Sequence, residues 1–175
     1  MTTQNNKVLP KGITQADFNQ AISEFRSLLG NDNVLTEEAQ LKPYNKIMMP
    51  VEDAAHAPSA AVTATTVEQV QGVVAICNKY KIPVWTISTG RNFGYGSAAP
   101  HHRGQIILDL QKMNKILHVD ADLGTALVEP GVTYQQLYDY LEDNNIPLML
   151  SFSAPSAIAG PLGNTMDRGV GYTPY

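Results

Sequence analysis

The sequence predicts an α+β fold in which βαβ units are joined to a short-stranded mixed sheet. Apolar residues recur at helical spacing in three stretches, and short β-branched or aromatic runs lie between them. The glycines are unevenly spread, because 8 of the 13 fall in two short stretches. With 175 residues, the chain can form one domain with a core, or a domain with a small extension. The clustered glycines are Gly90, Gly94, Gly96 and Gly104, then Gly160, Gly163, Gly169 and Gly171.

The first element that we expect is a helix over residues 15–29. Thr14 is a suitable N-cap, Gly30 supplies the stop, and apolar residues recur between them. The polar, proline-containing stretch over 31–58 follows, and we interpret it as a connecting arm that packs through its larger side chains, which are Tyr44, Met48 and Met49. The chain is therefore divided into an N-terminal helix and arm over 1–58 and a second domain over 59–175.

A β-α-β pattern opens the second domain. Residues 60–64 are typical of a short strand, and Thr66 with Gln69 forms a capping box at the start of a helix that runs to about residue 81. The predicted inner face of this helix consists of Val67, Val70, Val74 and Cys77. Residues 84–87, which are β-branched and aromatic, predict the next strand.

Further short strands are expected over 106–110, 116–119 and 126–129. Their short connections favour a partly antiparallel arrangement. Thr133 and Gln136 predict a second capping box, and its helix should turn Leu137, Tyr138 and Leu141 inward. A last strand over 148–150 is expected before the second glycine-rich stretch.

Composition excludes several classes of protein. Twelve basic against sixteen acidic residues give a net charge of −4, which argues against a nucleic-acid-binding footprint. The single cysteine, Cys77, excludes an internal disulfide framework and a cysteine-rich zinc site, and its place on an apolar helix face predicts a buried, inert thiol. The adjacent His101 and His102 are interpreted as part of a solvated turn rather than as metal ligands. We expect no metal.

The stretch from Ser88 to Pro100 contains Gly94-Tyr-Gly-Ser-Ala-Ala99, which formally matches the dinucleotide fingerprint GxGxxA. That fingerprint needs a helix to begin within it, whereas Pro100-His-His-Arg-Gly104 and a strand come next. A P-loop is excluded because no Gly-Lys-Ser/Thr is present. The remaining alternatives are an ordinary surface loop and a nest of backbone N–H groups that holds a diphosphate.

Three blocks of sequence resemble the vanillyl-alcohol oxidase / p-cresol methylhydroxylase family of flavoproteins. These are Ser88-Thr-Gly-Arg-Asn-Phe-Gly-Tyr-Gly96, Val128-Glu-Pro-Gly-Val-Thr133 and the stretch from Gly163 to Tyr175. The resemblance extends over essentially the whole chain. It implies the two-lobed FAD-binding domain of that family, lacking the substrate-capping domain that follows in the longer members.

The resemblance also implies roles for individual residues. The FAD diphosphate would lie on the first glycine-rich loop, at Ser88, Thr89, Gly90, Arg91, Asn92 and Gly94. The second loop would contribute Gly163, Asn164 and Asp167. Tyr95 matches the family tyrosine that hydrogen-bonds the phenol oxygen of the substrate. The covalent anchor of the flavin is expected outside this chain.

By the same resemblance, we expect an oxidoreductase that converts 4-alkylphenols, such as 4-cresol, to the benzylic alcohol or aldehyde. Hydride transfer to flavin would give a quinone methide that water attacks, and electrons would pass to a c-type cytochrome subunit. Two flavoprotein subunits would form a homodimer within the hetero-oligomer. The alternatives are an oxidase of vanillyl alcohol, a eugenol hydroxylase, and an inactive FAD-binding fragment. We expect no turnover from this chain alone, no nucleic acid or membrane as a partner, and a periplasmic location or, alternatively, a cytoplasmic one.

Overall fold

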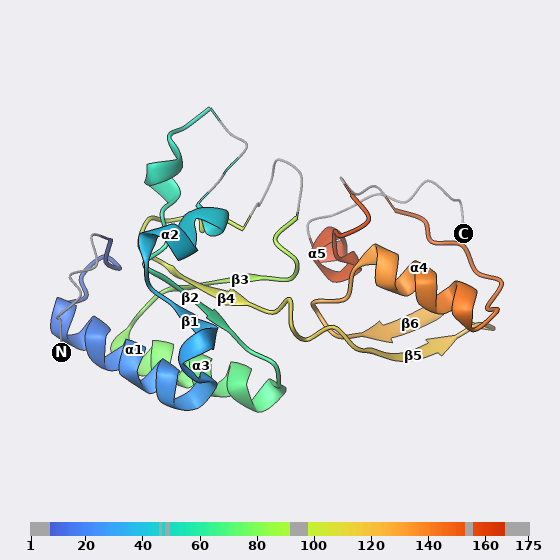
Figure 1. Ribbon diagram of the computed structural model, residues 1–175, viewed down its shortest axis with the longest axis horizontal. Helices are drawn as coiled ribbons and strands as arrows, with labels where there is room; N and C mark the ends of the chain where they lie inside the picture. Colours follow the sequence, from blue (N-terminus) through green and yellow to red (C-terminus); the bar gives the residue numbers. More distant parts are fainter. Residues whose placement is uncertain (1–7, 46, 48–49, 92–97, 153–155, 167–175) are drawn as a thin grey trace.

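The computed structural model describes residues 8–45, 47, 50–91, 98–152 and 156–166. These residues form two lobes that lie side by side (Figure 1). The first lobe contains a four-stranded sheet with helices on it, and the second contains a two-stranded sheet with two helices. Mixed helix and strand content in two lobes confirms the predicted fold class.

The sheet of the first lobe has the strand order β1-β2-β4-β3. Strands β2 (Ala60–Thr63), β4 (Ile106–Asp109) and β3 (Val84–Ile87) are parallel, and β1 (Val34–Leu35) runs antiparallel to β2. All four residues of β2 and of β4 are buried, which accounts for the apolar runs over 60–62 and 106–108. The carboxyl ends of the three parallel strands therefore meet at one edge of the sheet.

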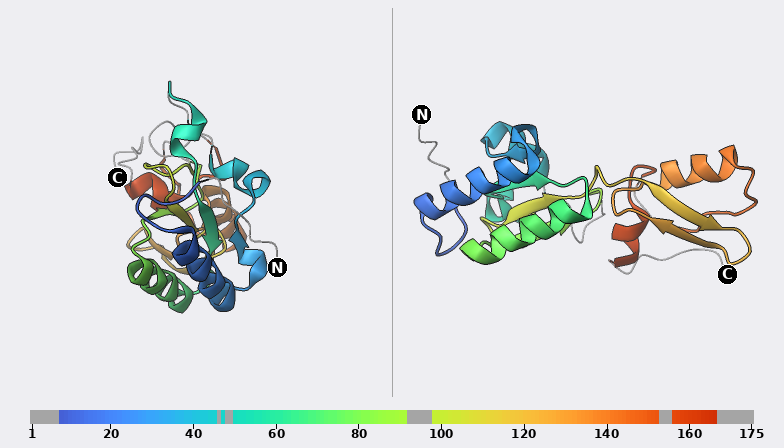
Figure 2. Two further views of the ribbon diagram at one scale, coloured as in Figure 1. Left: turned by 90° about the vertical axis from the view of Figure 1, so that its left-hand side faces the viewer. Right: turned by 90° about the horizontal axis from the view of Figure 1, so that it is seen from below.

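Helices α1 (Gln15–Leu29) and α3 (Val67–Tyr80) lie together on one face of this sheet, as Figure 2 shows from below. The predicted bounds of α1 are confirmed, with Thr14 accepting a hydrogen bond from the Asp17 N–H and Gly30 at the carboxyl end. Both helices contribute to a single apolar core with β2 and β4. In this arrangement α1 is part of the same core as the strands that follow it.

The buried face of α3 differs from the predicted one. Val73 and Cys77 are buried, whereas Val67 and Val74 are exposed. Because α3 packs against both the sheet and α1, the buried stripe is centred on residues that face both neighbours. The capping box is also incomplete, since Thr66 accepts from the Gln69 N–H but the Gln69 side chain accepts from Thr65 instead.

The stretch over 31–58, interpreted as a connecting arm, contains more structure than that interpretation allows. It supplies strand β1 to the sheet, the short helix α2 (Glu38–Leu41), and 3₁₀ turns at Asn31–Asn33, Lys42–Tyr44 and Asp53–His56. Its side chains cover the second face of the sheet. Leu41 is buried there in a cluster with Ala61, Ile87, Ala98 and Ile107, and Tyr44 and Trp85 pack against that cluster. The expected packing through Tyr44 is confirmed, and Met48 and Met49 lie outside the described residues.

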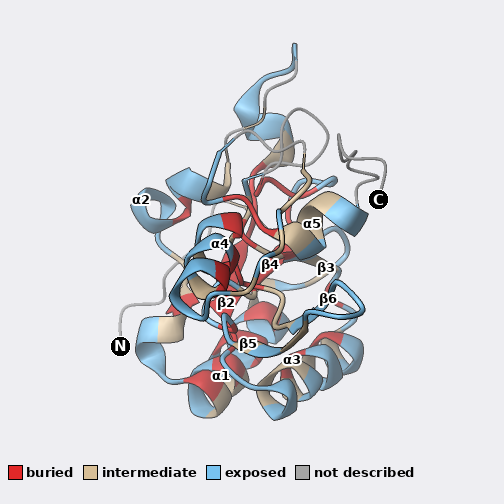
Figure 3. Cartoon of the chain, turned by 90° about the vertical axis from the view of Figure 1, so that its right-hand side faces the viewer, coloured by how far each residue is buried: buried red, intermediate tan, exposed pale blue. Residues whose placement is uncertain are grey.

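In the second lobe, β5 (Ile116–Asp120) and β6 (Thr125–Val128) form an antiparallel pair, and α4 (Tyr134–Asp143) and α5 (Pro161–Met166) follow. The capping box of Thr133 and Gln136 is confirmed, and Leu137 and Leu141 are buried, but Tyr138 is exposed. The prediction of a strand over 148–150 is wrong, because these residues adopt no regular structure. Figure 3 shows that burial is concentrated in the first lobe, while the β5–β6 hairpin is largely exposed.

None of the helices in the described part of the chain combines the length and the hydropathy needed to span a lipid bilayer.

Candidate cofactor-binding site

The first glycine-rich loop begins where β3 ends, at the carboxyl edge of the parallel sheet. Ile87 is the last residue of β3 and lies beside Asp109 of β4, so Ser88 and Thr89 emerge next to the end of the central strand. Ligands of open α/β sheets bind outside the carboxyl ends of the strands. The part of the connection from β3 to β4 that the structure describes contains no helix, and Gly94 to Ser97 of the dinucleotide fingerprint lie outside that part.

The conformation and the packing of this loop both favour glycine at position 90. Gly90 has φ +63°, in the left-handed region that favours glycine. A Cβ at this position would lie 3.1 Å from Ala98 Cβ and 3.2 Å from Ile87 Cδ1. Thr89 is buried, and neither its N–H nor that of Gly90 donates a hydrogen bond to another described residue. These two N–H groups therefore have no hydrogen-bond acceptor among the described residues.

The second glycine-rich stretch lies directly against the first. A Cβ on Gly160 would lie 2.7 Å from Ser88 Oγ and 3.0 Å from Thr89 Cγ2, and one on Gly163 would lie 3.5 Å from Ser88 Cβ. The sequence places these stretches about 70 residues apart, and the fold brings them together at the junction of the lobes (Figure 1). The second stretch is not an extended loop, because Gly163 and Asn164 lie within α5. Asn164 donates from Nδ2 to the hydroxyl of Tyr134 on α4, at 3.0 Å.

Of the predicted site residues, the structure places Ser88, Thr89, Gly90 and Arg91 in the first loop, and Gly163 and Asn164 in α5. The other four candidates, Asn92, Gly94, Tyr95 and Asp167, lie outside the described residues.

A buried carboxylate beside this edge was not predicted from the sequence. Asp109 is only 4% exposed, and its Oδ2 accepts a 2.6 Å hydrogen bond from the Tyr44 hydroxyl. The backbone N–H of Gln111 donates to Oδ1 at 2.8 Å. Burial, and then the hydrogen bond to Asp109, raise the pKa of Tyr44 well above its usual value, so this hydroxyl remains a donor. No local motif marks this pair, because its members are 65 positions apart.

The remaining histidines and the cysteine behave as structural residues. His101 and His102 are exposed, and His56 Nδ1 lies 2.9 Å from the Pro100 carbonyl oxygen. No group of three or more potential metal ligands is present among the described residues. Burial raises the pKa of the Cys77 thiol to about 12, which agrees with the predicted inert thiol.

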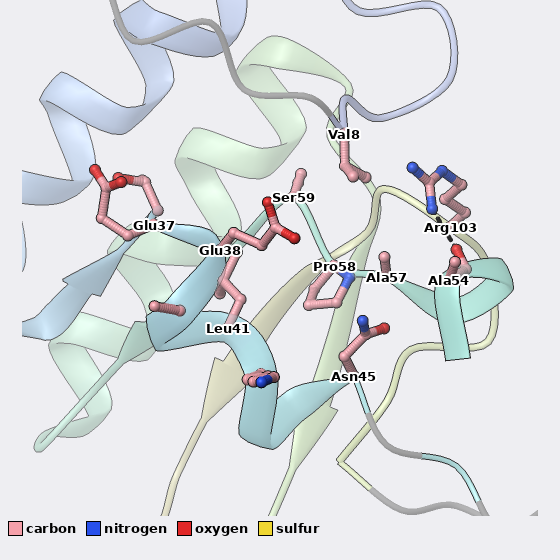
Figure 4. A pocket seen from close by; sticks show the side chains of 13 residues that line it. Val8, Glu37, Glu38, Leu41, Asn45, Ala54, Ala57, Pro58, Ser59 and Arg103 are labelled. Atoms are coloured by element: carbon pink, nitrogen blue, oxygen red, sulfur yellow. Dashed lines mark hydrogen bonds between the residues drawn. The ribbon is translucent and has the colours of Figure 1, made fainter. Parts of the chain in front are cut away.

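An open groove of about 760 Å³ lies elsewhere on the first lobe (Figure 4). Glu38, Asn45, Ser59 and Arg103 line it, and Arg103 donates to the Ala54 carbonyl oxygen on the same wall. Ser59 precedes β2 and Arg103 precedes β4, so the groove lies at the amino ends of the parallel strands. It is therefore at the opposite end of the strands from the glycine-rich loops.

The junction suits the diphosphate of FAD better than it suits a metal ion. It offers backbone N–H donors at Thr89 and Gly90 and the exposed guanidinium group of Arg91. Donors of this kind bind anions, and glycine at 90 and 160 allows the surrounding protein to pack closely at these positions. The residues present therefore fit the cofactor that the sequence implies.

Comparisons with known proteins agree with this geometry. Over all 175 residues, the chain is 76% identical to the 4-cresol dehydrogenase [hydroxylating] flavoprotein subunit of Pseudomonas putida, of which it covers 34%. The structure of p-cresol methylhydroxylase with substrate bound superimposes with a TM-score of 0.93 and 77% identity, over 96% of this chain and 33% of that one. The 4-ethylphenol oxidase of Gulosibacter chungangensis, in its isoeugenol complex, gives 0.90 and 39%, over 95% of this chain and 32% of that one.

The chain spans about a third of the length of these relatives. The FAD binding domain family matches residues 58–173, which include both glycine-rich stretches and most of the two lobes. On the strength of that match and of the two loops that meet beside β3, this chain belongs to the FAD binding domain family.

Proposed function

We propose that this chain is the FAD-binding part of an oxidoreductase that oxidises and hydroxylates 4-alkylphenols, converting 4-cresol to 4-hydroxybenzyl alcohol or aldehyde. The observation that carries the proposal is the 76% identity to a 4-cresol dehydrogenase flavoprotein subunit over the whole chain. The meeting of the two glycine-rich stretches at the carboxyl edge of the sheet supports it, because that edge is where this class of fold binds its ligand.

In this proposal the residues of the first loop bind the diphosphate. The N–H groups of Thr89 and Gly90 donate to its oxygens, and the guanidinium group of Arg91 adds positive charge. Ser88, Asn92 and Gly94 complete the first loop, and Gly163, Asn164 and Asp167 contribute from the second stretch. Bound FAD supplies the flavin ring that accepts a hydride from the benzylic carbon of the substrate.

Tyr95 is the residue of this chain that we propose for substrate binding. Its phenol hydroxyl would donate a hydrogen bond to the phenolate oxygen of the substrate. A hydrogen bond to a charged oxygen is about twice as strong as one between neutral groups, so it favours the deprotonated substrate. A deprotonated 4-alkylphenol loses a benzylic hydride more readily, because its ring carries the electron density that replaces it.

We further propose that electrons pass to a c-type cytochrome subunit, in a hetero-oligomer that contains two copies of the flavoprotein and lies in the periplasm. The relative in Pseudomonas putida is described as a flavoprotein subunit, which supports a partner subunit. An oxidase that returns electrons to oxygen is the second candidate, because a 4-ethylphenol oxidase shares 39% identity and a TM-score of 0.90 with this chain.

The experiment uses the protein purified from its natural source, with 4-cresol as substrate. We expect reduction of an artificial dye or of cytochrome c and little hydrogen peroxide. Abundant peroxide would support the oxidase instead. A protein that retains FAD but does not oxidise 4-cresol or 4-ethylphenol would contradict both proposals and favour an inactive FAD-binding fragment.

A further inference from the structure

The two lobes are joined by a hydrogen bond that lies beside the two glycine-rich stretches. The Ser88 hydroxyl donates to the carbonyl oxygen of Pro130, which lies 42 positions further along the chain. Ser88 follows β3 of the first lobe, and Pro130 follows β6 of the second. This contact therefore ties the lobes together beside the segment over 110–115, which joins β4 to β5 along the chain.

The turn that presents the Pro130 carbonyl is itself held in place. The Val132 N–H donates to the Glu129 carbonyl oxygen at 3.1 Å, and the Gly131 N–H donates to the Met113 carbonyl oxygen at 2.6 Å. Met113 belongs to the segment that links the lobes, and Val132 is fully buried. The acceptor of the Ser88 hydroxyl is consequently a fixed point of the second lobe.

Gly160 occupies the space next to this hydrogen bond. A Cβ there would lie 2.7 Å from Ser88 Oγ, 3.0 Å from Thr89 Cγ2 and 3.1 Å from the Val132 carbonyl oxygen. The first distance is shorter than real Cβ contacts, so Ser88 Oγ would have to leave its position or the second stretch would have to move away. The position of the Ser88 hydroxyl therefore requires that residue 160 has no side chain.

We infer that Ser88 is a positioning residue, whose hydroxyl holds the two lobes in register across the cofactor-binding loops, with Gly160 as the glycine that this contact requires. This inference rests on the proposed cofactor site. A hydroxyl has one proton to donate, and that proton is directed to Pro130. The Ser88 side chain therefore serves FAD by fixing the separation of the loops rather than by donating to the diphosphate.

The test combines Ser88→Ala, Gly160→Ala and the double variant in the full chain, with FAD affinity measured by quenching of its fluorescence. Ser88→Ala should weaken binding by about threefold to tenfold. Gly160→Ala should weaken it more, but by a clearly smaller factor in the Ser88→Ala background, because the nearest clashing atom is then gone. The circular dichroism of bound flavin at saturation should change in Ser88→Ala. Ser27→Ala, which removes an exposed hydroxyl on α1, is the control and should change neither reading.

If Gly160→Ala weakened FAD binding by the same factor with and without Ser88→Ala, the inference would be overturned in favour of a direct contact between Ser88 and the diphosphate. An unchanged circular dichroism of bound flavin in Ser88→Ala would overturn it in the same way. Hydrogen exchange without FAD provides a second reading that does not depend on cofactor binding. In Ser88→Ala the Gly131 and Val132 amides should exchange faster while those of α1 and α3 do not, and unchanged exchange would also overturn it. A wild-type chain that binds no FAD would instead count against the proposed function.

Discussion

The Tyr44 hydroxyl donates a 2.6 Å hydrogen bond to Oδ2 of Asp109, which fastens the segment over 42–45 to the carboxyl end of the central strand β4. Asp109 also lies beside Ile87, the residue from which the first glycine-rich loop begins. The covering segment of the sheet and the proposed cofactor-binding edge are therefore linked through one buried carboxylate.

Tyr44→Phe should destabilise the chain by about 1.5–3 kcal/mol, because it removes a donor from a buried charged group and leaves the ring in place. Urea unfolding at neutral pH measures this loss. Tyr138→Phe is the matched control, since that ring is 51% exposed, and it should have little effect. Equal stability of the two variants would show that the Tyr44 hydroxyl contributes nothing to folding.

The same tyrosine predicts a loss of stability in alkali. Its pKa in the folded chain is raised above the ordinary value of 10.0, mainly by burial. Below the ordinary pKa of 10.0 the tyrosine keeps its proton in both the folded and the unfolded state, and the hydrogen bond contributes fully. Above pH 10.0 the unfolded state loses the proton that the folded state retains, so stability falls as the pH rises. The advantage of wild type over Tyr44→Phe should shrink between about pH 10 and pH 11 in urea unfolding, and an advantage that grew would contradict the assignment.

Cys77 should not react with a disulfide reagent while the chain is folded. It is 4% exposed, and burial raises its pKa to about 12, so almost none of it is thiolate at neutral pH. We expect one thiol to react per chain in denaturant and almost none in native buffer. Val74→Cys combined with Cys77→Ala is the control, because position 74 lies on the same helix and is 41% exposed. Fast labelling of native wild type would show that α3 opens readily.

Gly90→Ala should weaken FAD binding, because it places a side chain in the left-handed region and pushes against Ala98 and Ile87. A cost of about 1 kcal/mol in the loop corresponds to about fivefold in affinity. Gly124→Ala is the matched control, since its φ is +61° and a Cβ there meets nothing within 4 Å. Fluorescence titration with FAD should separate the two, and equal affinities would remove Gly90 from the site.

Most helices and strands could be predicted from the sequence because their signals are local. The caps at Thr14 and Thr133 act on N–H groups three residues away, and the strands over 60–63 and 84–87 are marked by their own side chains. The uneven distribution of glycine marks the two glycine-rich stretches. The three sequence blocks, in their order along the chain, mark the resemblance to a flavoprotein family. The strand expected over 148–150 failed, since a short apolar run does not distinguish a strand from an irregular segment.

Sequence by itself determined helices α1, α3 and α4, strands β2 to β6 and the positions of the two glycine-rich stretches, because each depends on residues close together in the chain. Only the tertiary structure decided which residues from distant segments meet. It placed β1 in the sheet, turned Val73 rather than Val74 into the core, and brought Asp109 to Tyr44 and Ser88 to Pro130. Such contacts form only when loop-closure entropy is offset by burial of the whole core, so no local pattern encodes them.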